Sequence, residues 1–177
     1  FIYTTKSIVA NCKSYGITEA RKDNVGAVVG KADLGLITDS IGCGQAKSST
    51  GSYAGGVVGH SSSTVRNSYS KATVSAEAYA GGIAGFGHVI RSCGGLAYIT
   101  DCDEFAGGIA GDADSDYTDC YFVGGTGGVD GISYEGKAQS VDFGTFANLP
   151  NLPKELTYLT LTFRTEDKSV AEVLADY

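Results

Sequence analysis

Four aspartates between residues 112 and 119 have the types and spacing closest to a metal site. Asp112-Ala-Asp114-Ser-Asp116 begins like a calcium-binding loop, and Asp119 adds a fourth carboxylate. Such a loop also requires glycine at its sixth position and glutamate at its twelfth, and this chain has neither. Weak binding of Ca²⁺ by the four aspartates is therefore one interpretation, and a solvated turn is the other. The sequence indicates no other cofactor.

Three aromatic residues, Tyr53, Tyr79 and Phe105, each stand directly before an Ala-Gly-Gly triplet. Rings at equivalent positions of successive repeats can stack on one another as a column inside a coiled structure. If the rings are exposed instead, they form a platform for sugar rings or for a partner protein. This column therefore indicates a host glycan or protein as the class of external partner.

The five cysteines lack the spacing of a zinc site, because no C-x-x-C pair occurs and the chain has two histidines. Cysteine can serve as a small buried apolar residue, and we expect buried free thiols. The alternative is a disulfide that joins Cys93 to Cys102 or to Cys120. The five residues are Cys12, Cys43, Cys93, Cys102 and Cys120.

Charge and hydropathy exclude several classes of partner. The chain has 13 basic and 20 acidic residues, which gives a net charge of −7, and no cluster of Lys and Arg. A nucleic-acid partner is not expected, since phosphate binding requires a basic surface. No apolar run approaches the roughly 18 residues of a spanning helix, so we expect no membrane insertion by this segment. The absence of Met among its 177 residues indicates a piece of a larger protein.

Two motifs repeat along the chain with nearly the same period. The closing glycines of the first are separated by 29, 26 and 26 residues, and the last positions of the second by 28, 28, 25 and 27. Two motifs that keep one period indicate an internal repeat. Copies of the first are 25–30 (VGAVVG), 53–59 (YAGGVVG), 79–85 (YAGGIAG) and 105–111 (FAGGIAG). Copies of the second are 9–12 (VANC), 37–40 (ITDS), 65–68 (VRNS), 90–93 (IRSC) and 117–120 (YTDC).

Each repeat unit contains short strand-like stretches separated by Gly, Ser, Asp or Asn, and none shows helical periodicity over ten residues. A unit of 26 to 29 residues cannot bury its own apolar side chains, so the units must stack. The sequence predicts an all-β fold, a parallel β-helix-like β-solenoid of about five coils and about 24 Å in height. Its 26 glycines then serve at corners with positive φ or where stacked backbones approach closely.

Stacking predicts columns of equivalent residues. The first position of the second motif points inward, its last position fills a tight turn, and its third position hydrogen-bonds turn backbone. The inward column is Val9, Ile37, Val65, Ile90 and Tyr117; the turn column is Cys12, Ser40, Ser68, Cys93 and Cys120; and the third is Asn11, Asp39, Asn67, Ser92 and Asp119.

The repeats YAGGVVG, YAGGIAG and FAGGIAG, with VRNSYS at 65–70, resemble the GLUG motif. The resemblance covers residues 8 to 125 and is looser in the first unit, where Ala27 replaces the second glycine. That family occurs in large bacterial surface and secreted proteins, including adhesins and non-catalytic regions of IgA-specific metallopeptidases. The resemblance implies extracellular display on a repetitive β scaffold and supplies no catalytic residues.

An enzyme of the polysaccharide-lyase type is the catalytic alternative, because parallel β-helices include such lyases. It would require Asp112, Asp114 and Asp116 to meet Arg91 in one groove. Arg66 and Arg91 occupy equivalent positions of adjacent units, and a solvent-facing column explains them equally. The metallopeptidase signature H-E-x-x-H is missing. We therefore expect no catalytic residues.

The last third of the chain lacks the repeat. Residues 126–146 are predicted to form a loop that leaves the solenoid of residues 1–125, and residues 147–177 a β-hairpin. The alternating segment 158–163 (YLTLTF) and the apolar residues of 169–177 carry the hairpin prediction. It is either a cap on the open solenoid edge or the start of a following module.

The sequence thus predicts a non-enzymatic structural or adhesive segment of a bacterial cell-surface or secreted protein, located outside the cell. Its partners would be neighbouring modules of a longer chain and a host glycan or protein. A glycan- or protein-binding module that uses exposed tyrosines or Asp/Asn columns is the alternative.

Overall fold

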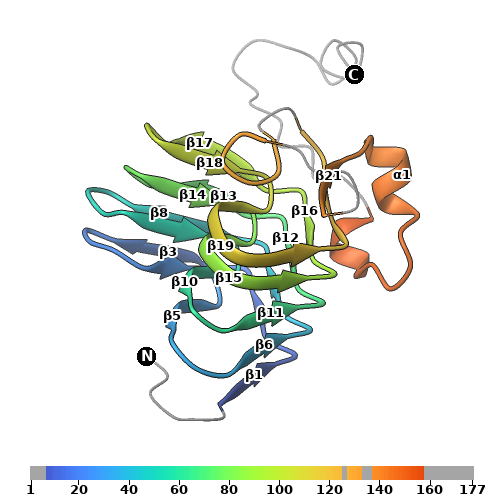
Figure 1. Ribbon diagram of the computed structural model, residues 1–177, viewed down its shortest axis with the longest axis horizontal. Coiled ribbons are helices and arrows are strands. Elements are labelled where there is room, and N and C mark those ends of the chain that lie inside the picture. Colours follow the sequence, from blue (N-terminus) through green and yellow to red (C-terminus); the bar gives the residue numbers. More distant parts are fainter. Residues whose placement is uncertain (1–6, 125–126, 133–136, 158–177) are drawn as a thin grey trace.

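A computed structural model describes residues 7–124, 127–132 and 137–157, and it shows short parallel strands stacked in layers around a common axis (Figure 1). The strands form four parallel sheets, and two of the sheets contain four strands each. The chain therefore makes about four complete turns, and strands that belong to the second repeat motif recur in five layers. The predicted all-β solenoid is confirmed.

The sheets are named A to D. Sheet A contains β1 (Ile8–Ala10), β5 (Val29–Ala32), β6 (Leu36–Thr38), β10 (Val58–Ser61), β11 (Thr64–Arg66), β15 (Ala84–Arg91) and β19 (Ala110–Thr118). Sheet B contains β2 (Lys13–Ser14), β7 (Ile41–Gly42), β12 (Tyr69–Ser70), β16 (Gly94–Gly95), β20 (Cys120–Phe122) and β21 (Ala138–Ser140). Sheet C contains β3 (Ile17–Ala20), β8 (Gln45–Ser48), β13 (Thr73–Ser75) and β17 (Tyr98–Asp101). Sheet D contains β4 (Val25–Gly26), β9 (Tyr53–Gly55), β14 (Tyr79–Gly81) and β18 (Phe105–Gly107).

The repeat motifs coincide with the layers of the solenoid. Val9 pairs in register with Ile37, which pairs with Val65 and so on through Ile90 to Tyr117. Tyr53, Tyr79 and Phe105 are likewise in register on sheet D. The predicted superposition of equivalent residues in columns is thus confirmed, because parallel in-register pairing places residues one repeat apart above one another.

The corner between sheets A and B is made by residues with left-handed backbone. Asn11, Asp39, Asn67, Ser92 and Asp119 have φ between 46° and 56°. Asn and Asp are the non-glycine residues that adopt this conformation most readily, because their short side chains bond locally to the backbone. The third position of the second motif is therefore a corner column.

The repeat glycines have a different use from these corners. Among the described glycines only Gly35, Gly124, Gly127 and Gly131 have positive φ, and none belongs to the double-glycine motif. A Cβ on Gly56 would collide with the Ser70 hydroxyl and with the Gly82 carbonyl of neighbouring layers. Of the two predicted uses of glycine, close backbone approach applies to the motif, and the corner prediction is wrong for it.

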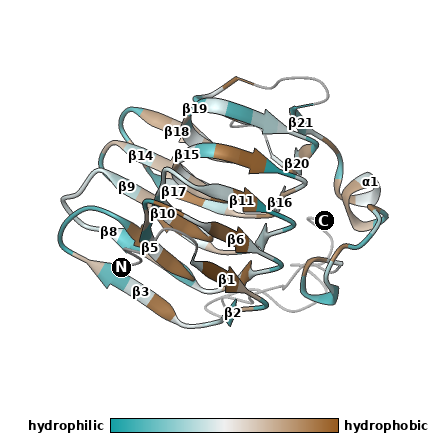
Figure 2. Cartoon of the chain, turned by 60° about the horizontal axis from the view of Figure 1, so that its bottom comes forward, coloured by the Kyte–Doolittle hydropathy of each residue, from teal (hydrophilic) through white to brown (hydrophobic). Residues whose placement is uncertain are grey.

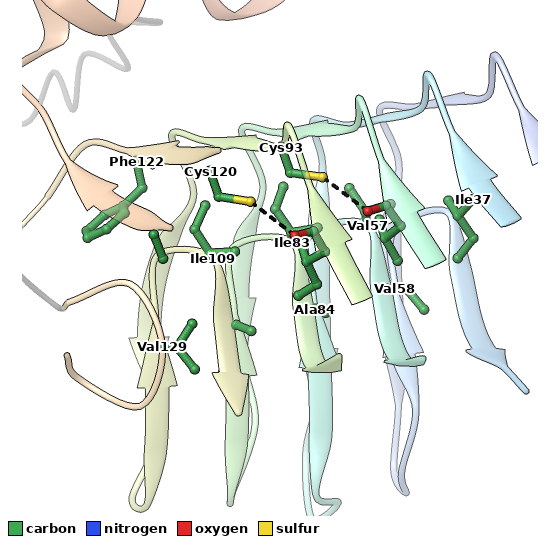
Figure 3. Packing of buried hydrophobic residues seen from close by; sticks show 14 of the residues in the cluster. Ile37, Val57, Val58, Ile83, Ala84, Cys93, Ile109, Cys120, Phe122 and Val129 are labelled. Atoms are coloured by element: carbon green, nitrogen blue, oxygen red, sulfur yellow. Dashed lines mark hydrogen bonds between the residues drawn. The ribbon is translucent and has the colours of Figure 1, made fainter. Parts of the chain in front are cut away.

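The core is a row of aliphatic side chains that runs through the layers (Figure 3). Ile37, Val57, Val65, Ile83 and Ile90 are at most 1% exposed. Cys93 and Cys120 complete the turn column above Ser40 and Ser68, and their Sγ atoms lie 3.8 and 3.6 Å from the carbonyls of Val65 and Ile90. The row ends at Phe122, which is fully buried.

The segment after the coils lies along sheet B and is named the strap (residues 141–157). It contains helix α1 (Phe143–Ala147) and a 3₁₀ turn (Lys154–Leu156), and α1 stands beside sheet B in Figure 1. Phe146 and Leu156 are fully buried against Ile41 and neighbouring apolar residues. Asp142 caps α1 by accepting a hydrogen bond of 2.8 Å from the Thr145 amide, which lowers the pKa of Asp142.

Two predictions concern the last third of the chain, and the structure tests only the first of them. The loop expected over 126–146 is wrong in part, because β21 adds a sixth strand to sheet B and α1 follows it. These elements form because apolar residues of 138–156 have an unfilled sheet face to cover. The alternating strands of the predicted hairpin, 158–163 and 169–177, lie outside the described residues.

Candidate functional site

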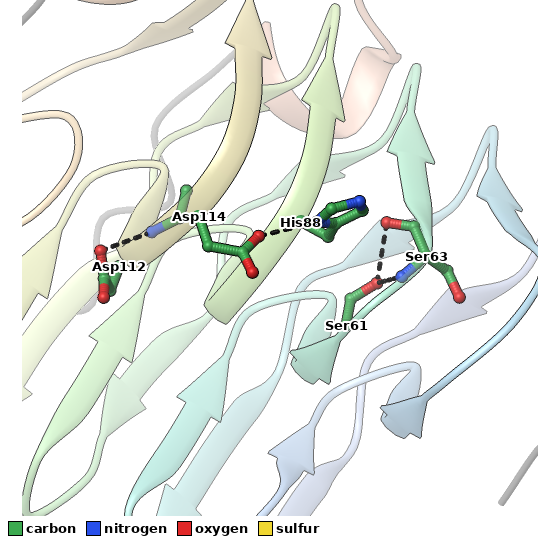
Figure 4. A network of polar contacts seen from close by, with 6 residues as sticks. Ser61, Ser63, His88, Asp112 and Asp114 are labelled. Carbon is green, nitrogen blue, oxygen red and sulfur yellow. Dashed lines mark hydrogen bonds and ion pairs between the residues drawn. The ribbon is translucent and has the colours of Figure 1, made fainter.

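Strand β19 carries Asp112, Asp114 and Asp116 in an extended conformation. Alternate residues of a strand are about 6.6 Å apart along its axis, so the three carboxylates are spread out instead of converging. Asp114 Oδ1 lies 2.7 Å from His88 Nδ1, as Figure 4 shows, and Asp112 Oδ1 accepts a bond from the Ala113 amide. Each carboxylate is therefore engaged with a neighbour on its own part of the surface.

The calcium interpretation of these residues is not supported. Asp119 stands at the corner after β19, where it accepts a hydrogen bond of 3.0 Å from Ser92 Oγ. Within 7–124, 127–132 and 137–157, no three His, Cys, Asp or Glu side chains gather closely enough to hold a metal ion. A calcium loop folds around its ion, whereas β19 is an extended strand that pairs with β15 over most of its length, with a register shift between Ala113 and Asp116.

The arginine ladder is present, but it does not build a lyase groove. Arg66 and Arg91 are in register on adjacent layers. Arg91 donates to Asp116 Oδ2 from Nε at 3.0 Å and from Nη2 at 2.6 Å, on an exposed surface. This ion pair, in which two guanidinium nitrogens share one carboxylate oxygen, joins Asp116 to Arg91 and leaves Asp112 and Asp114 elsewhere on the strand. Their convergence in one groove, which the lyase alternative required, is not observed.

The predicted stacking of the three rings is confirmed, but the expectation that they stack inside the coil is wrong, because they stand on the outer side of sheet D. The rings of Tyr53 and Tyr79 are 4.8 Å apart at 23°, and those of Tyr79 and Phe105 are 4.6 Å apart at 10°. The next residues along the strands, Ala54 and Ala80, are fully buried. Because side chains alternate along a strand, the partly buried rings point outward and not into the coil.

This stack presents ring edges more than ring faces. Tyr79 has a ring on each face, and a second stack of His60 and Phe86 (4.9 Å, 16°) meets Tyr53 edge-on. A sugar ring packs against an open aromatic face. In the predicted platform of Tyr53, Tyr79 and Phe105, both faces of the central Tyr79 ring are therefore covered by the other two rings and are not open to a sugar.

His60 is the polar member of this aromatic cluster. Its Nδ1 is buried and has no hydrogen-bond partner among the described residues. Burial and the nearby Lys31 ammonium lower the pKa of His60, so the ring is neutral at pH 7. A neutral imidazole that stacks on Phe86 acts as an aromatic packing residue.

The corner column forms the wall of a cleft that the sequence did not reveal. The cleft has a volume of about 490 Å³ and lies between the corner column and the strap. Burial raises the pKa of Tyr69, which stands in its wall. Its lining residues are Asp39, Asn67, Tyr69, Ser92, Cys93, Asp119, Tyr121, Leu149, Pro150 and Asn151.

The lining of this corner cleft is polar and acidic. Carboxylates, an amide and hydroxyls recur on successive layers, about 4.8 Å apart, and two tyrosine rings stand beside them. No Lys or Arg lines it, so an anionic ligand has no counter-charge there. The sequence predicted the corner column as turn residues. It did not predict the cleft, because Leu149 and Asn151 lie beside the corner column only where the strap crosses sheet B.

The cysteines are free thiols, as expected, but not all are buried. Cys93 and Cys120 are buried, and burial raises the pKa of the Cys93 thiol well above its ordinary value. Cys43 and Cys102 are partly buried, and Cys12 is exposed in the first coil. The predicted burial thus holds in the turn column except at the open first layer.

In comparisons with known proteins, no family model, no curated protein and no solved structure matches the chain. Among the helices of the described residues, none has the length and apolar character needed to cross a membrane.

Proposed function

We propose that this chain is a non-enzymatic structural or adhesive segment of a bacterial cell-surface or secreted protein, of the GLUG type. The observation that carries the proposal is the use of the repeat motifs. Their apolar residues fill the core columns, their glycines allow layers to approach, and their Asn and Asp residues turn the corners. A sequence repeated for architecture alone suits a rigid spacer that holds neighbouring modules apart.

Removal of one coil tests the spacer. Deletion of residues 56–81 joins Gly55 to Gly82 and preserves both motifs, because Gly55 and Gly81 are in register. The chain, placed between two fluorescent reporter domains, should stay folded and bring them closer by about one strand spacing, 4.8 Å. Energy transfer should rise, with a narrow distribution of distances.

The matched control is a deletion of residues 56–75, which removes 20 residues and destroys the register. It should lose the strand signal in circular dichroism. If the 26-residue deletion unfolds equally, or if the full chain gives the broad distance distribution of a flexible linker, the spacer proposal fails.

The corner cleft favours a second function, the binding of a neutral oligosaccharide along the corner column. Its repeated acceptors and donors match the repeated hydroxyls of a glycan, and Tyr69 and Tyr121 offer apolar contact. Titration with chitotetraose, followed by NMR, should shift the amides of residues 67–69 and 92–93. Anionic oligogalacturonate should not bind, because the cleft carries carboxylates.

Two variants localise such binding. Asn67→Gly keeps the left-handed corner while removing the amide, and it should weaken the titration. Arg66→Ala changes the adjacent exposed residue outside the cleft and should leave it unchanged. Equal effects of the two variants, or no shift at millimolar sugar, would exclude this second function.

A further inference from the structure

The N-terminal end of the solenoid is an open edge on every side. Among residues 7–124, 127–132 and 137–157, β1, β2, β3, β4 and β5 each pair on one side only, with β6, β7, β8, β9 and β10. An edge strand presents unpaired backbone N–H and C=O groups that can pair with another strand. All the strands of the first coil therefore offer such groups in the same direction along the axis.

The core is also open at this end. Val9 and Val28 are partly exposed, whereas Ile37 and Val57, the next residues of the same columns, are 1% and 0% exposed. A hollow of about 340 Å³ opens between the interior side chains of the first coil. It is lined by Val9, Cys12, Lys13, Ser14, Ala27, Val28, Val29 and Gly30.

Apolar side chains surround this open face. Ile8, Tyr15, Ile17 and Leu34 are 67%, 62%, 75% and 53% exposed, and all four belong to the first coil. Figure 2 shows the hydrophobic colour in β1 and β3 at this end of the stack. Charges occur on these edge strands at Lys13, Glu19 and Lys31, but the exposed apolar residues beside them still favour contact with another apolar surface.

The molecule itself shows what fits this face. In every inner layer the same face is covered by the preceding coil, in parallel register. The amides of Ile41 and Gln45 donate to the carbonyls of Cys12 and Gly16, at 2.8 and 3.0 Å. By register, the equivalent amides of the first coil are those of Lys13 and Ile17.

We propose that the N-terminal face of the first coil is a docking surface for another β-solenoid coil of this same repeat, added in parallel register by a further polypeptide segment. Its backbone would bond to Lys13 and Ile17, and its aliphatic columns would close over Val9 and Val28. A second copy of this chain fits less well, because segment 127–132 bonds to β18 and β19 across the opposite end. Two N-terminal faces could meet only with antiparallel strands.

Grafting one coil tests this surface independently of any spacer role. A copy of residues 36–63 is inserted between Ser7 and Ile8 of the full chain, so that its last residue meets β1 as Ser63 meets β11. Hydrogen exchange at the amides of Lys13 and Ile17 should slow by about tenfold or more, towards the rates of Ile41 and Gln45.

The matched control is the same graft with Ile37→Asp and Val57→Asp in the added copy, which places charges in the core columns. It should leave exchange at Lys13 and Ile17 as fast as in the ungrafted chain. The proposal is overturned if the unmutated copy gains strand signal while these two amides still exchange fast. It is also overturned if the ungrafted chain protects them by forming a dimer as its concentration rises, because the occupant is then a second copy.

Discussion

The two ends of this solenoid are built from one repeat and finish in opposite ways. At the N-terminal end, five strands of the first coil have no partner on one side within the part of the chain that the structure describes, and Val9 and Val28 are partly exposed. At the C-terminal end, Phe122 fills the coil, Val129 covers it at 5% exposure, and the Gly108 and Ile109 amides bond to the backbone of 127–132. The repeat makes layers, and residues outside the repeat pattern cover the last layer at sheets A, B and D, whereas β17 of sheet C pairs on one side only among the described residues.

The second glycine of each Ala-Gly-Gly triplet, with Ala27 at the equivalent position of the first coil, shows how the two ends differ in detail. In the first coil this position is Ala27, whose methyl faces Gly42. In the middle, Gly56 faces the Ser70 side chain, and at the closed end Gly108 faces the Phe122 ring. Of these three facing residues, the one at the closed end, Phe122, is by far the largest, and it fills the space where the core ends.

The largest expected effect is at the closed end. Phe122→Ala should lower the free energy of unfolding by about 3–5 kcal/mol, because it empties a fully buried site. Val28→Ala at the open end should cost less than about 1 kcal/mol, since its side chain is already partly exposed. Urea denaturation measures both, and equal losses would contradict the difference between the ends.

The glycine column gives the next effect. Gly56→Ala should cost about 1–3 kcal/mol, because the new methyl meets the Gly82 backbone carbonyl as well as a side chain. Ala27→Gly in the first coil should cost only about 0.5–1 kcal/mol, from backbone entropy. Thermal unfolding of the two variants tests this order, and its reversal would show that the layers are not tightly spaced at Gly56.

The corner column should show a smaller effect that depends on position. Asn67→Ala should cost about 1–2 kcal/mol, because alanine is strained at φ 46°, and Asn67→Gly should restore stability. Asn11→Ala has the same local strain at φ 56° but should cost less in global unfolding, because the first coil opens before the rest. Hydrogen exchange separates local from global opening. A full global cost at Asn11 would show that the open end does not fray.

The smallest effect concerns the contact by which the strap holds the open end. Glu155 accepts bonds from Lys13 Nζ at 2.9 Å and from the Tyr15 hydroxyl at 3.0 Å. The Lys13 ammonium is the main cause that lowers the pKa of Glu155 to about 2. Because the folded pKa lies below the ordinary value of 4.5, the contact stabilises the fold above pH 4.5 and is lost as the pH falls towards 2.

Glu155→Gln should therefore cost about 0.5–1 kcal/mol at pH 7 and little near pH 2, with a weaker effect in high salt. The melting temperature of the variant and the parent chain as a function of pH tests this. A difference that persists unchanged at pH 2 would show that Glu155 acts by packing and not by charge.

Much of the architecture could be predicted because a repeat shows the same environment several times in one sequence. The register of Val9, Ile37 and Val65 follows from their spacing, and so does the stack of Tyr53 on Tyr79. The aspartates of β19 were misread because three alternating Asp residues describe a loop and a strand face equally well. Pairing with the long strand β15 decides between the two.

The sequence by itself determined the period, the parallel solenoid and the residues that form each column, since equivalent residues must superpose when identical units stack. Only the tertiary structure decided that the aromatic stack lies outside, that the strap covers sheet B, and that the strap and the corner column together form a cleft. The physical reason is that the residues of each column recur in every repeat unit, so the sequence shows their shared environment several times. The position of Phe146 and Leu156 depends on a single apolar face built from residues far apart in the chain.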